Sequence, residues 1–210
     1  MKRRFFQLGA AVLSTALLCA ALPPIIGVAS ALGTFIVNSA EVQGNANLFD
    51  GAQIKTSKAS SQIFLQNGAS LVLGIDSAGT IYRDRLVLEQ GAAKIDNMSG
   101  FAVEAREYRI VSGQPASQVV VRLNGESVEV AALAGSVNVL NTGGALLTRI
   151  GSGTATAFQS NGGNGGSGTA RPNNNNRIRK DAALYLLLVG ALAGLGLGVA
   201  AISESTSTSP

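Results

Sequence analysis

Residues 63–73 read IFLQNGASLVL, where apolar and polar side chains alternate on both sides of Asn67-Gly68. A period of two is typical of a strand with one buried face, and Asn-Gly between two such runs predicts a hairpin turn. Residues 120–130 read VVRLNGESVEV and repeat this phrase. Aligning the two Asn-Gly pairs matches Ile63 with Val120, Ser70 with Ser127, Leu71 with Val128 and Leu73 with Val130. Stacked copies of one strand–turn–strand unit would explain the match, and so would two independent hairpins, because Asn-Gly is a common hairpin signal.

The rest of residues 32–160 has the same character. Short runs rich in β-branched and aromatic residues predict further strands, among them TFIV, QIKT, TIYRDRLVLE, AKID, FAVEA, YRIVS, SVNVLN and ALLTRI. Small polar turns separate the runs, and we expect five glycines to occupy such turns because glycine tolerates a positive φ: Gly51, Gly68, Gly91, Gly125 and Gly135. No helical period lies between the runs, so the sequence predicts an all-β domain, as a sandwich, a barrel or a solenoid.

Composition limits the class of partner. Charged residues make up 13% of the 210 residues, against roughly 25% in an average globular domain. The net charge of +4 arises at the two ends of the chain, since residues 32–170 contain nine basic and ten acidic residues. A nearly neutral domain offers no basic face to phosphates, so we expect no nucleic-acid partner.

The first 31 residues, MKRRFFQLGAAVLSTALLCAALPPIIGVASA, have the layout of a secretory signal peptide. A basic start precedes an apolar run that Pro23-Pro24 interrupts, and the stretch from Ala29 to Ala31 fits a cleavage site with small residues. We therefore predict cleavage after Ala31, with an uncleaved N-terminal anchor as the alternative. The single cysteine, Cys19, lies within the predicted leader.

Residues 182–202, AALYLLLVGALAGLGLGVAAI, carry no charge and are long enough to span a bilayer of roughly 30 Å as a helix. The sequence therefore predicts one transmembrane helix. Gly190, Gly194 and Gly198 would share one face of it, where small residues let two helices approach and form a homodimer. Glycine is also frequent in membrane helices generally, so a purely compositional origin stays open.

A Gly/Asn-rich linker with a basic flank, residues 161–181, precedes this helix, and a short polar tail, residues 203–210, follows it. The predicted order is a leader, a folded domain over residues 32–160, a flexible tether and a membrane anchor. This order places the domain in the periplasm as part of a single-pass protein. The basic flank lies on the outer side in this topology, which runs against the positive-inside bias.

The sequence lacks the side chains on which catalysis usually depends. Histidine is absent, and no cysteine would remain after removal of the leader. Carboxylates alternate with arginines, and we interpret Glu104, Arg106 and Tyr108 as one face of a single strand that forms a solvated charge ladder. We therefore expect no enzyme activity, no cofactor and no metal site.

Five phrases of the sequence carry a family resemblance, in the order LFDGAQIKT, SSQIFLQNGASLVLG, YRDRLVLEQGAAKI, SVEVAALAGSVNVLN and GSGTATAF. Together they resemble the FecR domain, the periplasmic module named after the ferric-citrate regulator, over about residues 44–158. The resemblance implies a β-solenoid-like stack of short strands, with turn glycines at its corners; an antiparallel sandwich is the alternative.

FecR regulators carry a cytoplasmic segment that holds a sigma factor, and here only residues 1–7 precede the first apolar run. The sequence therefore favours a stand-alone, non-catalytic module tethered in the bacterial envelope, which binds an envelope protein or glycan or acts as a scaffold. The alternative is a signalling component that couples an outside stimulus through helix association.

Overall fold

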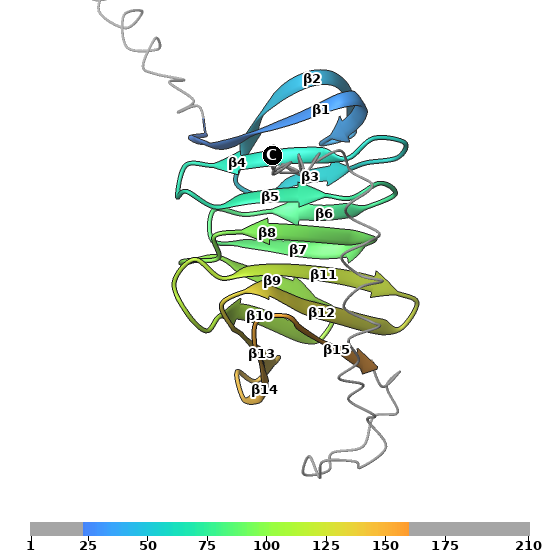
Figure 1. Cartoon of the computed structure of the whole chain (residues 1–210). Helices are drawn as coiled ribbons and strands as arrows, with labels where there is room; N and C mark the ends of the chain where they lie inside the picture. Colours follow the sequence, from blue (N-terminus) through green and yellow to red (C-terminus); the bar gives the residue numbers. More distant parts are fainter. Residues whose placement is uncertain (1–22, 160–210) are drawn as a thin grey trace, which may run out of the picture.

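A computed structural model describes residues 23–159, and every regular element within this range is a β-strand (Figure 1). The prediction of an all-β domain is confirmed. The strands are β1 Ile25–Val37, β2 Ala40–Phe49, β3 Ala52–Lys55, β4 Ser61–Leu65, β5 Ser70–Leu73, β6 Ala78–Ile81, β7 Arg85–Gln90, β8 Ala92–Asp96, β9 Ala102–Ala105, β10 Tyr108–Ser112, β11 Gln118–Asn124, β12 Ser127–Ala134, β13 Val137–Asn141, β14 Leu146–Ile150 and β15 Thr154–Gln159.

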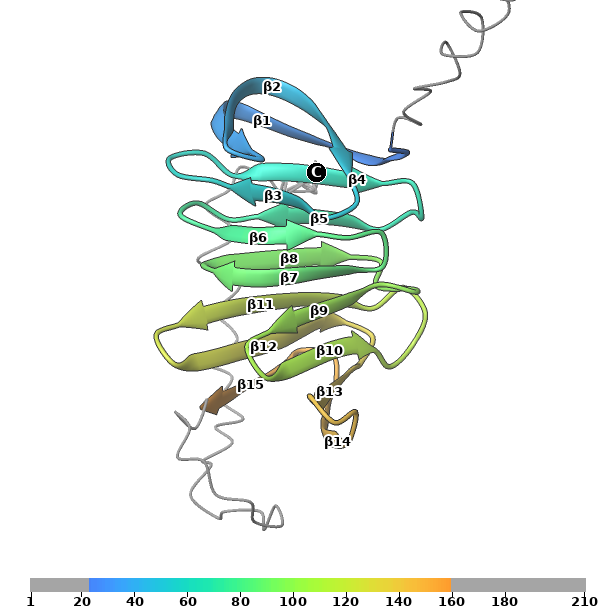
Figure 2. The same ribbon diagram turned by 180° about the vertical axis from the view of Figure 1, so that it is seen from behind.

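The strands form two facing layers that stack from the N-terminal to the C-terminal end (Figures 1 and 2). The front layer has the order β4-β5-β8-β11-β12-β15, and the back layer has the order β3-β6-β7-β9-β10-β13-β14. Strand β1 joins them at the top, because residues 27–30 pair with β4 and residues 36–37 pair with β3. Strand β2 pairs with β1 and closes the same end.

Strand direction decides between the expected architectures. Of the fourteen strand pairings within residues 23–159, thirteen are antiparallel, and only that of β7 with β9 is parallel. A solenoid coil would return each strand parallel to its equivalent one turn earlier. Here short hairpins alternate between the two layers instead, so the solenoid-like expectation is corrected in favour of an antiparallel, two-layered arrangement.

The two inner faces share one hydrophobic core. Alternate residues of each strand point inward, and the largest fully buried side chains come from both layers, including Ile63 and Leu71 in front and Ile81 and Ile110 behind. The hairpins bury mainly their inward faces, so the units become stable by covering one another.

Buried hydroxyl groups form hydrogen bonds with the backbone at a corner where the chain crosses between the layers. The Thr56 hydroxyl donates to the Gly74 carbonyl and accepts from the Ser77 amide, 3.0 Å away. The Ser77 hydroxyl in turn accepts from the Ala92 amide at 2.9 Å. At this corner an added Cβ on Gly91 would lie 2.7 Å from the Ser77 Cα, so the glycine allows a close backbone approach.

The two Asn-Gly phrases both form hairpins, β4–β5 and β11–β12, but they are equivalent only in their second strands. Leu71 and Val128 both lie in the core. In the first strands Ile63 points into the core, whereas Val120 lies on the outer side of the sheet. The cause is loop length: Phe64 pairs with Ser70 across five residues, whereas Asn124 pairs with Ser127 across two. A shift by an odd number of residues reverses the faces of a strand.

Candidate functional site

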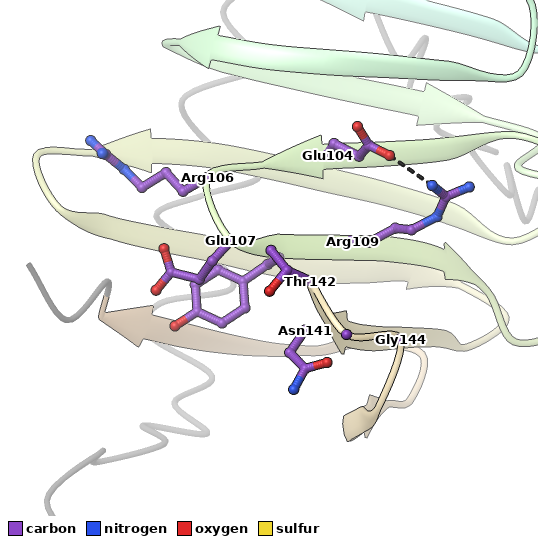
Figure 3. Close-up of a pocket in the computed structure, with 9 residues that line it drawn as sticks. Glu104, Arg106, Glu107, Arg109, Asn141, Thr142 and Gly144 are labelled. Carbon is purple, nitrogen blue, oxygen red and sulfur yellow. Dashed lines mark hydrogen bonds and ion pairs between the residues drawn. The ribbon is translucent and has the colours of Figure 1, made fainter. Parts of the chain in front are cut away.

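An open cavity of about 480 Å³ lies between the tips of two hairpins of the back layer (Figure 3). The β9–β10 hairpin supplies Glu104 to Arg109, and the β13–β14 turn supplies Asn141 to Gly144. These segments are separated by more than thirty positions in the sequence and meet because β10 pairs with β13. The cavity is therefore a product of strand order.

Charged side chains of this region form ion pairs with one another. Glu104 Oε1 lies 2.7 Å from Arg109 Nη1, and its other carboxylate oxygen lies 3.4 Å from Arg85 Nε. Arg85 also lies over the ring of Tyr82, with 4.2 Å between the guanidinium carbon and the ring centre. The expected charge ladder exists, but it runs across β7, β9 and β10. The expectation of a single strand through Glu104, Arg106 and Tyr108 is corrected, because the chain turns at residues 106–107.

Tyr108 lines the cavity and contacts β15, the last strand of the front layer. Its hydroxyl donates to the Gln159 carbonyl at 2.9 Å, and its ring lies 5.0 Å from that of Phe158. Burial raises the pKa of Tyr108 to about 12, and the nearby charge of Glu107 adds to this shift. The phenol is therefore neutral at physiological pH and acts as a structural hydrogen-bond donor.

The hairpin tips are held by backbone contacts. Arg106 Nη2 donates to the Gly125 carbonyl of the front layer. The Asn141 side-chain oxygen accepts from the Ala145 amide at 2.9 Å and so closes the β13–β14 turn. A polar ligand could meet amide and guanidinium groups here. The contacts of Glu104 and Tyr108 do not arrange a general base beside a nucleophile, and within residues 23–159 no group of three or more metal-ligating side chains comes together.

The outer faces of the two layers carry different sets of side chains. On the back layer, Gln53 and Thr80 are followed by Val87 of β7 and then by Glu104 and Arg109 across the paired strands. At the far end of this layer, Leu146 and Leu147 of β14 are 60% and 47% exposed. On the front layer, Val28 of β1 lies directly opposite Phe64 of β4, and these side chains are 38% and 51% exposed.

Lower on the same front side, a second apolar cluster lies outside the main core. It consists of Val120, Ala131 and Ala155, with Leu133 packed against them. These residues belong to β11, β12 and β15, and they alternate with inward-pointing neighbours such as Val119 and Val121. Val120, Ala131 and Ala155 are 0–1% exposed, so this end of the front layer buries its outward apolar side chains, unlike the exposed Val28–Phe64 pair.

The predicted site residues fall in three places. The five turn glycines have positive φ values: Gly51 82°, Gly68 86°, Gly91 79°, Gly125 58° and Gly135 68°. The predicted cleavage residues Ala29 and Ala31 lie inside β1, where Ala29 is completely buried. The helix-face glycines Gly190, Gly194 and Gly198 lie outside the described residues, as do the linker, the tail and the predicted transmembrane helix. Between residues 23 and 159 no helix has the length and hydropathy needed to cross a membrane.

The Val28–Phe64 pair is not evident from the sequence alone. A signal was present, because Phe64 stands at a polar position of the alternating run in residues 63–73. Its partner Val28 lies within residues 1–31, which the sequence predicts to be the leader.

Comparison with known proteins gives a distant likeness. No protein-family model and no curated protein matches the chain. Matching solved structures include two crystal structures, at 1.65 Å and 2.50 Å, of a "putative anti-sigma factor" from Parabacteroides distasonis ATCC 8503. The identities are 16% and 18% and the TM-scores 0.44 and 0.43, over 53% of this chain. The matched region covers 57% and 56% of those chains, little more than half of their length.

Proposed function

We propose that this chain is a stand-alone FecR-like module of the bacterial envelope, which binds a protein partner without catalysing a reaction. The order of the FecR-like phrases in the sequence supports the family, and the all-β architecture is compatible with it. The leader and the apolar segment of residues 182–202 support an exported, membrane-tethered location.

The exposed pair Val28–Phe64 carries the binding proposal. Covering large apolar side chains on a sheet surface with a partner is favourable, by roughly 25 cal/mol for each Å² of apolar area removed from water. Phe64 is the largest of them, and aromatic residues are enriched in interface cores. The back layer exposes Leu146 and Leu147, but these are neighbours on the single strand β14. We place the contact with a partner on β1 and β4, where two large exposed apolar side chains face each other across paired strands.

The test is photo-crosslinking in cells at Phe64, with Gln53 on the outer face of the back layer as the matched position. We expect a crosslinked protein at position 64 that is absent at position 53. The same protein should be retained by the purified domain and lost in Phe64→Ser, while Gln53→Ser retains it. Phe64 lies outside the core, so both variants should keep the far-UV circular dichroism spectrum of the wild type.

Two results would contradict this proposal. One is an identical crosslinking pattern at both positions, which would mean that the apolar pair contacts no specific partner. The other is equal retention by wild type and Phe64→Ser, which would place the interface elsewhere.

A further inference from the structure

We infer that residues 25–31 belong to the mature domain, and that the leader ends at Ala21 instead of Ala31. The inference concerns the site of proteolytic processing. It rests on the role of β1 in the fold; the binding surface proposed above includes Val28 and so requires residues 25–31 in the mature chain.

The first half of β1 is part of the front layer. Residues 27–30 pair with residues 62–65 of β4, and the Gln66 amide donates to the Ile26 carbonyl at 2.9 Å. Ser61 adds a side-chain hydrogen bond to the Ser30 carbonyl at 3.2 Å. Within the described residues β4 has only β1 and β5 as neighbours, so this segment supplies half of its hydrogen-bonding partners.

The side chains of the same half belong to the core. Ile26 is 2% exposed and Ala29 is 0% exposed, and both pack in the main cluster with Ile63 and Leu65. At Gly27 an added Cβ would lie 2.4 Å from the Phe64 carbonyl oxygen, so the backbones of β1 and β4 approach as closely as glycine permits. A leader segment needs only to be apolar, whereas this segment fits a particular neighbour at each position.

Cleavage after Ala31 would separate the two layers at their junction. The remaining part of β1 would keep its pairing with β3 through Ile36 and Val37 and lose all its pairing with β4. Strand β2, which among the described strands pairs only with β1, would lose six of its ten register partners. The product would expose the edge of β4 and the core residues beneath it.

The sequence offers an earlier processing site that leaves β1 whole. Residues 1–4 are basic apart from the initiator methionine, and residues 5–18 are predominantly apolar, within the usual range of roughly 7–15 residues for the apolar region. Cys19-Ala20-Ala21 then places small residues at the first and third positions before the cut. Cleavage there leaves Leu22 and the exposed residues Pro23 and Pro24 as a spacer before Ile25.

Intact-mass analysis and N-terminal sequencing of the full chain, purified from cell envelopes, test the inference. We expect an N-terminus at Leu22. An N-terminus at Leu32 would overturn the inference, because the mature protein would then lack the first half of β1. An N-terminus at Met1 would also overturn it, since the leader would be an uncleaved anchor.

Two variants test the position of the cleavage site with a measurement that does not require a folded protein. Leader peptidases require a small residue directly before the cut, so Ala21→Tyr should leave the precursor unprocessed. Ala31→Tyr introduces the same side chain at the rejected site and should be processed as the wild type is. The readout is the mass of the chain, which does not depend on whether the variant folds. Processing of Ala21→Tyr together with retention of the Ala31→Tyr precursor would refute the inference.

Discussion

Replacing Gly91 by alanine tests whether close backbone approach at a corner holds the two layers together. Gly91 has a φ of 79°, and a Cβ there would lie 2.7 Å from the Ser77 Cα and 2.8 Å from the Asp76 carbonyl oxygen. Both atoms belong to backbone, so the clash cannot be relieved by rotating a side chain. The Ser77 hydroxyl, which accepts from the Ala92 amide, would also be displaced.

The expected loss of stability has three contributions. A left-handed backbone costs an alanine about 1–2 kcal/mol relative to glycine. Overpacking against fixed backbone costs about 1–3 kcal/mol. Weakening a buried hydrogen bond adds about 1 kcal/mol. We therefore expect the free energy of unfolding to fall by about 3–6 kcal/mol, a large part of the roughly 5–15 kcal/mol of an ordinary domain.

Gly144→Ala is the matched control. Gly144 also has a φ of 79°, and nothing lies within 4 Å of the Cβ it would carry. This variant should lose only the backbone contribution of about 1–2 kcal/mol. Urea unfolding of residues 22–160, followed by far-UV circular dichroism, measures both variants. Equal losses in the two would show that the corner at Ser77 has room for a side chain, and the argument from close approach would be wrong.

Three further predictions concern other parts of the chain. The pKa of Tyr108 is raised from 10.0 to about 12, which favours the neutral phenol in the folded state, so stability should hold below pH 10 and decline from pH 10 to 12. In urea unfolding, Tyr108→Phe should abolish this decline of the midpoint. The variant should also cost about 1 kcal/mol at pH 7, because the hydrogen bond to Gln159 is lost. Glu104→Gln should lower stability by less than about 1 kcal/mol, and added salt should shrink the difference, because this ion pair is partly exposed; a larger, salt-independent loss would contradict that view. Gly194→Ile should abolish self-association of residues 177–205 in an in-membrane dimerisation reporter, whereas Leu195→Ile should preserve it; equal, monomer-like signals from both variants and the wild type would make the glycines compositional.

Local patterns in the sequence determined much of this protein. Alternation of apolar and polar residues predicted strands, and Asn67-Gly68 and Asn124-Gly125 predicted the hairpins β4–β5 and β11–β12. These signals are reliable because side-chain alternation and turn geometry involve residues close together in the chain.

Pairing between distant segments decided the rest. The meeting of Glu104 with Arg85 and Arg109 depends on β9 lying between β7 and β10, an order that no spacing in the sequence specifies. The difference between the solenoid and the antiparallel arrangement depends on the layer each hairpin enters, and both arrangements bury the same alternating residues.

The clearest case is the segment from Ile25 to Ala31. Its small and apolar residues fit a leader, and they fit equally well a strand whose neighbours approach closely, because membrane and protein core both exclude water. Sequence composition shows only that the segment suits a water-free environment, and does not say which of the two it enters. The tertiary structure shows Gly27 and Ala29 against β4, and this contact assigns the segment to the fold.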